Sequence, residues 1–194
     1  MEEKISIKRE NVLNAYKHAS EEQKTLLESM FGKDMFKPKD IMERVKTFED
    51  ACEVLGEDNV LVQAYRTAEF NTSGNQNDVT DVVAYLKLRI ICAALNEGWQ
   101  PTFSDDECTY YPWFFFYTKD EYDELDEDVK KECHIIGRLH KTLSQNGGIV
   151  FVSAINAASN TYSHYGFMIA FKTLELAKYC GKQFIDIWSD YLFG

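Results

Sequence analysis

Seven of the eight residues in the stretch Tyr110-Tyr-Pro-Trp-Phe-Phe-Phe-Tyr117 are aromatic. Aromatic side chains favour the pleated surface of a strand, so this stretch predicts a β-strand. Pro112 lacks an N–H group and places the start of that strand away from a central ladder. Two more extended segments are predicted downstream, Gly148–Ala154 after a Gly147-Gly148 turn and Tyr165–Lys172. Together the three segments predict a small antiparallel sheet.

Helical patterns lie on both sides of these segments. Residues 79–97 are densely apolar, which predicts a buried helix that ends at Gly98. A second helix is expected from about Thr173, where apolar residues recur every three or four positions. The recurring residues are Leu174, Ala177, Gly181, Phe184, Ile185, Trp188 and Leu192. We expect these two helices to cover the sheet.

The N-terminal part is predicted to be helical. Two short helices fit the first forty residues, with a capping box at Ser20 and Gln23 and a stop at Gly32. A further helix is expected from Thr47, with Asp50 as its capping partner, to Gly56. The polar stretch Asn71–Asp78 predicts a surface loop.

Helices first and strands second are typical of an α+β protein, and not of an alternating parallel-sheet fold. The predicted fold class is therefore α+β: N-terminal helices plus a small antiparallel sheet, covered by a buried helix and the C-terminal helix. We expect an N-terminal helical segment, 1–40, and a single α+β domain, 41–194.

Composition narrows the classes of partner. The 194 residues are 45% hydrophobic and 27% charged, as in folded proteins, and carry a formal charge of −11. That charge argues against a nucleic acid or an anionic membrane as the main direct partner. Five cysteines without a Cys-x-x-Cys pair suggest reduced thiols, and no signal peptide or membrane span is recognisable. The expected location is cytoplasmic.

The acidic charge is concentrated in residues 105–132, which hold eleven acidic and three basic residues. A solvated helix or loop face is the simplest interpretation. A calcium loop is a sharper alternative, but Asp126-Glu-Asp-Val-Lys-Lys lacks the glycine at which an EF-hand loop turns. A third interpretation is an acidic mimic of nucleic-acid phosphates that inhibits a host nucleic-acid-binding protein.

Three interpretations of the aromatic run are open to comparison. It is most simply a strand with one face in the core. A stacking platform for bases requires basic flanks, whereas Asp105-Asp-Glu107 and Asp120-Glu121 are acidic. A contact with another protein or a second copy needs no basic charge and is the favoured functional role.

Motifs for chemistry are weak. Cys133-His134 with His140 is the nearest approach to a zinc cluster but lacks two close-spaced ligand pairs. Ser163-His164 has no nucleophile-elbow context, and no phosphate-cradling glycine motif occurs. The sequence therefore nominates no catalytic residue, cofactor or metal, and leaves open whether the protein is an enzyme.

Three stretches carry a resemblance. They are Arg44-Val-Lys-Thr-Phe-Glu-Asp-Ala-Cys-Glu-Val-Leu-Gly56, then Leu95-Asn-Glu-Gly-Trp-Gln-Pro101 with Tyr111-Pro-Trp-Phe114, and Phe171-Lys-Thr-Leu-Glu-Leu-Ala-Lys-Tyr-Cys-Gly-Lys-Gln-Phe184. Together they resemble a family of uncharacterised proteins on phage-like and mobile elements of anaerobic gut bacteria. The resemblance covers roughly residues 40–194. It implies a genetic setting and an α+β architecture, but no catalytic residues.

The expected pocket or interaction surface lies where aromatic residues and the start of the last helix meet: Trp99, Tyr111, Trp113 and Lys172. The expected function is a non-enzymatic accessory or protein-interaction protein of a phage-like or mobile element, with a protein partner or a second copy. The alternatives are an enzyme acting on a small molecule or nucleic-acid component, and the acidic mimic.

Overall fold

The protein is described by a computed structural model that covers residues 6–72, 79–102, 104, 106–132, 134–136, 147–158 and 166–193. Its contacts divide the chain into two compact units, Met1–Arg44 and Val45–Gly194. The predicted loop at Asn71–Asp78 lies outside the described residues, except that Asn71 and Thr72 end a helix.

The first unit is helical, as predicted. It contains α1 (Arg9–Lys17), α2 (Glu21–Phe31), the 3-10 helix η1 (Lys33–Met35) and α3 (Ile41–Arg44). The capping box at Ser20 is confirmed, because its hydroxyl accepts from the N–H of Gln23 while the Gln23 side chain accepts from the N–H of Ser20. Gly32 ends α2 with φ of 82°, a conformation that glycine adopts without strain. Local capping chemistry thus sets the bounds of α2.

Three helices open the second unit: α4 (Phe48–Leu55), α5 (Val60–Thr72) and α6 (Thr80–Leu95). The predicted capping box of α4 and the stop at Gly56 are confirmed. The predicted buried helix is α6, whose fully buried residues include Leu88, Ile91 and Leu95. Helix α5 was not predicted. It packs on α6 and buries Val62 and Tyr65.

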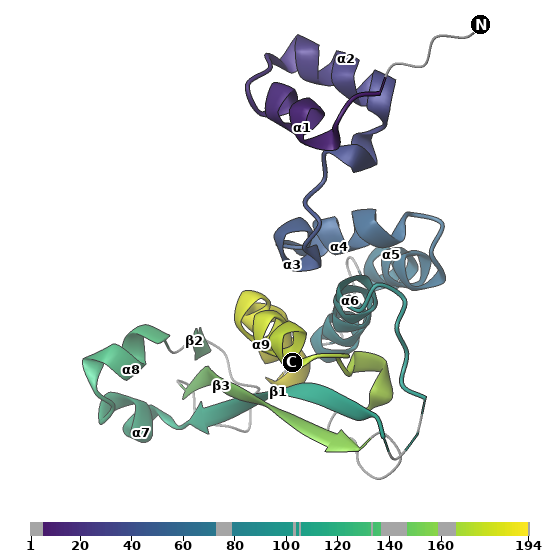
Figure 1. Ribbon diagram of the computed structural model, residues 1–194. Helices are drawn as coiled ribbons and strands as arrows, with labels where there is room; N and C mark the ends of the chain where they lie inside the picture. Colours follow the sequence, from purple (N-terminus) through teal and green to yellow (C-terminus); the bar gives the residue numbers. More distant parts are fainter. Residues whose placement is uncertain are drawn as a thin grey trace, which may run out of the picture. The chain divides into compact units, whose positions relative to one another are not determined.

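The sheet has three antiparallel strands in the order β1-β3-β2, as Figure 1 shows. They are β1 (Cys108–Tyr117), β2 (His134–Ile136) and β3 (Gly147–Ala158). The aromatic run thus forms β1, and Pro112 lies in an edge strand as expected. The predicted strand at Gly148–Ala154 is β3, which is the central strand.

The prediction of a strand at Tyr165–Lys172 is wrong. Within the described part of this segment, Phe167–Ile169 forms the 3-10 helix η2. Gly166 has φ of 86°, and its carbonyl accepts from the N–H of Ile169, so the backbone turns where a strand would continue. Only Phe171 pairs with the sheet, through an isolated bridge to Tyr110. The third strand is β2 instead.

The predicted C-terminal helix is two helices, α9 (Leu174–Gln183) and α10 (Ile185–Phe193). Phe184 separates them with φ of −117° and ψ of 32°. Helix α9 packs on β1 and β3 (Figure 1). Helix α10 packs on α6 and more lightly on β2. Phe184 and Trp188 are buried, as predicted. Because of this break, the apolar residues of α9 pack on the sheet while those of α10 pack on α6.

The acidic segment forms two short helices, α7 (Lys119–Asp123) and α8 (Glu127–Glu132). The side chains of Glu127 and Asp128 are exposed, and they pair with Lys130 at 3.2 Å and Lys131 at 2.9 Å. This geometry matches the solvated face that the charge pattern predicts. Surface pairs of this kind contribute little to stability.

Replacing Thr47 by alanine will lower the free energy of unfolding of the second unit by about 1 kcal/mol, because the N–H of Asp50 loses its acceptor. The pKa of Asp50 is itself lowered: burial raises it, but the N–H groups of Thr47 and Lys46 outweigh that effect. All three tryptophans lie in this unit, so tryptophan fluorescence during urea unfolding reports on it. Thr47→Ser keeps the hydroxyl and is the control. Equal losses in the two variants would contradict the capping role.

Candidate functional site

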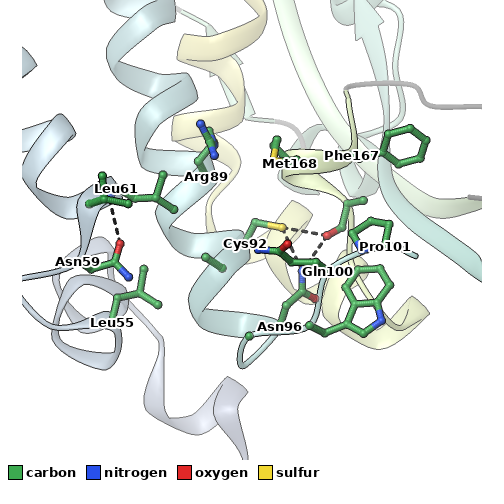
Figure 2. Close-up of a pocket in the computed structure, with 15 residues that line it drawn as sticks. Leu55, Asn59, Leu61, Arg89, Cys92, Asn96, Gln100, Pro101, Phe167 and Met168 are labelled. Atoms are coloured by element: carbon green, nitrogen blue, oxygen red, sulfur yellow. Dashed lines mark hydrogen bonds between the residues drawn. The ribbon is translucent and has the colours of Figure 1, made fainter. Parts of the chain in front are cut away.

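A groove of about 350 Å³ lies over α6 in the second unit (Figure 2). Its floor is α6 itself, through Arg89, Cys92, Ala93 and Asn96. One wall is the connection from α4 to α5, residues 55–61. The other wall combines residues 98–101 with residues 167–170. Small-molecule sites commonly have this size and a mainly apolar lining.

Two turns build the second wall. After α6, Glu97 has φ of 50° and Gly98 has φ of 85°, and the N–H of Trp99 bonds to the carbonyl of Asn96 at 3.0 Å. This reversal brings Trp99 and Pro101 back beside the helix. The turn at Gly166 likewise places Phe167 and Met168 at the groove. Tight turns with positive φ thus position the aromatic part of the wall.

Asn96 holds this wall to α6. Its amide nitrogen donates to the carbonyl of Ala170 at 2.8 Å, and its amide oxygen accepts from the backbone N–H of Lys172 at 3.0 Å. Asn96 is 3% exposed, so these bonds replace water for every group involved. Cys92 donates to the same Ala170 carbonyl at 3.0 Å. Burial raises the pKa of Cys92, which keeps the thiol protonated as that donor requires.

Arg89 is the one lining residue with a formal charge. Its Nε atom is buried without a hydrogen-bond partner, and the described residues offer its guanidinium no ion pair. Arg66 of the same unit is different, because it lies 2.7 Å from Glu49 and 3.3 Å from Glu57. A half-buried guanidinium without an anion is unusual, since burying a charge costs free energy that a partner normally offsets.

The four residues expected at one site fall into separate places. Trp99 lines the groove, and Lys172 is tied to its floor through Asn96. Tyr111 is fully buried in the core, and Trp113 is 38% exposed on β1. Neither Tyr111 nor Trp113 lines the groove. Of the four residues that were expected to form one site, only Trp99 lines the groove.

Sequence reasoning missed Arg89, Asn96 and the wall at residues 55–61. A signal for Arg89 was present, because it is a charged residue inside a helix that is otherwise apolar on most sides. The wall at residues 55–61 gave no such signal. Its Leu55 and Leu61 resemble ordinary core residues, and only packing places them across the helix from Pro101 and Phe167.

A second feature is the exposed end of β1, where Trp113, Phe115 and Tyr117 alternate along one side of the strand; we call them the aromatic face. Phe115 is 52% exposed, and its ring centroid lies 6.4 Å from that of Tyr117. Phe116 points the other way, is also 52% exposed and packs against Phe193. Such clustered exposure marks contact surfaces more often than scattered apolar residues do.

Metal and thiol chemistry find little support in the described chain. There, no three His, Cys, Asp or Glu residues come together as a metal site, so the acidic helices do not form a calcium cage. Cys52, Cys92, Cys108 and Cys180 form no disulfide among themselves. Cys133, His140 and the Ser163-His164 pair lie outside the described residues, as does the side chain of His134.

No family model, curated protein or solved structure matched the chain when it was compared with all three. Among the described residues, no helix combines the length and apolar character that a bilayer span requires.

Proposed function

We propose that this protein is a non-enzymatic accessory protein of a phage-like or mobile element that acts by binding another protein through the aromatic face of β1. The supporting observation is the exposure of Trp113 and Phe115 on an edge strand, at 38% and 52%. Exposed aromatic clusters are enriched at the centres of protein interfaces. The genetic setting follows from the resemblance carried by the three stretches described above.

The edge position strengthens this proposal. Strand β3 covers one edge of β1, and on the other edge Phe171 pairs with Tyr110, with N···O distances of 3.0 and 2.9 Å. That bridge lies at the start of the strand, away from the aromatic face. Pro112 removes one N–H donor from the strand, which disfavours indiscriminate pairing of edges. We therefore expect β1 to bind its partner through side chains and not by adding a new strand to the sheet.

The acidic mimic is a second candidate, favoured by the exposed carboxylates of α7 and α8. Glu127 and Asp128 stand 82% and 94% exposed even though lysines pair with them. If this surface inhibits a basic host protein, the interaction will weaken steeply with salt. Binding through the aromatic face will depend on salt only weakly, so a salt titration of the captured complex distinguishes the two roles.

Photo-crosslinking tests the aromatic face. With p-benzoylphenylalanine in place of Phe115, in protein expressed in its native host, irradiation is expected to give one dominant adduct, a second copy or one other protein. Val82, which is 51% exposed on α6, is the matched control position and is expected to give none. The double variant Trp113→Ser, Phe115→Ser will reduce the affinity for that partner by about tenfold or more. Burial of one large apolar side chain contributes roughly 1.5–3 kcal/mol to binding, and the variant removes two of them. Equal adduct yields at positions 115 and 82 would contradict the proposal.

A further inference from the structure

We infer that the groove over α6 binds a small organic carboxylate, with the carboxylate on Arg89 and an apolar body against the wall formed by Trp99 and Phe167. This role is separate from protein binding through β1. The described residues that carry it all belong to the second unit, and they come from four different segments of the chain.

The charge of the ligand follows from Arg89. The guanidinium carries a permanent positive charge and five donors in a planar fork, a geometry that matches a carboxylate. Its Nε is buried without an acceptor, and no carboxylate among the described residues pairs with it. Cys92 adds no negative charge, since burial raises its pKa. The groove therefore presents one uncompensated cation, in a protein whose net charge is −11.

The body of the ligand follows from the remaining lining. Figure 2 shows Pro101, Phe167 and Met168 on one side of α6 and Leu55 and Leu61 on the other. Trp99, two residues before Pro101, also lines the groove. Met168 is 51% exposed and Val60 at the opposite wall is 74% exposed, so apolar surface is open to water on both sides. A flat hydrocarbon group would cover that surface, and the indole of Trp99 offers it a stacking partner.

The polar groups favour a single carboxylate over a more heavily charged anion. Both polar atoms of the Asn96 amide are already used by Ala170 and Lys172. The Asn59 oxygen accepts from the N–H of Leu61 at 2.9 Å. Gln100 is exposed at the rim. One cation and few spare donors match one carboxylate, whereas a phosphate needs more donors than the groove presents.

Two probes of the same shape test the inference on the full-length protein: 2-naphthoate and its neutral analogue 2-naphthamide. Binding is followed by the NMR signal of the Trp99 indole N–H, which the loss of one signal in Trp99→Phe assigns. We expect 2-naphthoate to shift this signal and to bind roughly tenfold or more tightly than 2-naphthamide, the ratio that one charge-assisted pair supports.

Arg89→Gln will remove the preference for the carboxylate, whereas Arg89→Lys will weaken it without reversing it, since the charge remains and the fork is lost. Lys178→Gln, which changes an exposed charge on α9 outside the groove, is the matched control and will keep the wild-type ratio. The comparison of the two probes on the wild-type protein stands even if a variant fails to fold.

Four results would overturn the inference. One is equal affinity for the two probes, which would leave an apolar groove without anion recognition. Another is a shift of other indole N–H signals by 2-naphthoate without a shift of the Trp99 signal, which would place the anion elsewhere. The third is an unchanged preference in a folded Arg89→Gln protein. The fourth is the absence of any effect of either probe at millimolar concentration.

Discussion

Replacing Trp188 by alanine will lower the free energy of unfolding of the second unit by about 3–5 kcal/mol, the range for removal of a large buried aromatic side chain. Trp188 is fully buried, with ring-centroid distances of 5.5 Å to Phe114 and 6.1 Å to Tyr191. It therefore links β1 and α10 within one core. Because domains are stable by only about 5–15 kcal/mol in total, the variant will unfold far more readily.

Urea unfolding followed by the fluorescence of the two remaining tryptophans measures this loss. Trp113→Ala is the matched control, because that side chain is 38% exposed and its removal leaves a smaller cavity. We expect the control to lose less than half as much stability as Trp188→Ala. Similar losses in the two variants would mean that β1 and α10 do not share the core described above.

Replacing Asn96 by leucine will lower the same free energy by about 1–3 kcal/mol, the cost of one unsatisfied polar group, because the backbone N–H of Lys172 loses its acceptor. The carbonyl of Ala170 also loses the Asn96 amide as a donor, but the Cys92 thiol still donates to it.

Gln100→Leu is the control for Asn96→Leu, because Gln100 is an exposed amide four residues further along the chain that lines the same groove. Its free energy of unfolding should stay within about 0.5 kcal/mol of the wild type. A change of that small size in Asn96→Leu would show that water or a shifted backbone readily replaces the amide. The groove would then have a second wall that moves.

The elements set by local chemistry were predictable. Caps at Ser20 and Thr47, and stops at Gly32 and Gly56, fix helix bounds through hydrogen bonds within a few residues. The aromatic composition of β1 is equally local. The sequence therefore predicted the α+β class, the strands β1 and β3, and the buried helix α6.

Elements set by tertiary contacts were not predictable in the same way. Strand β2 has three residues and exists through its pairing with β3. The break at Phe184 is invisible in the pattern, because apolar residues recur every three or four positions on both sides of it. At Gly166 the apolar residues that follow looked like a strand, although one residue with positive φ was enough to turn the chain.

The candidate site shows the same division. Trp99 was predicted as a pocket residue, because amphipathic aromatic residues and a helix N-terminus can form a pocket. Trp99, Arg89 and Leu61 line one groove only because segments that are distant in sequence pack together. Tyr111 and Trp113 are two residues apart on β1, yet one is buried and the other exposed, a difference that alternation alone does not predict.

The position of Trp188 also bears on how the chain matures during translation. A ribosome makes the N-terminal part first, so α6 and all three strands emerge before the indole that completes their core. Until α10 emerges, the face of α6 that it covers remains open to water and to chaperones. The second unit is thus expected to acquire its native packing late, and nascent chains arrested before Trp188 should remain sensitive to protease.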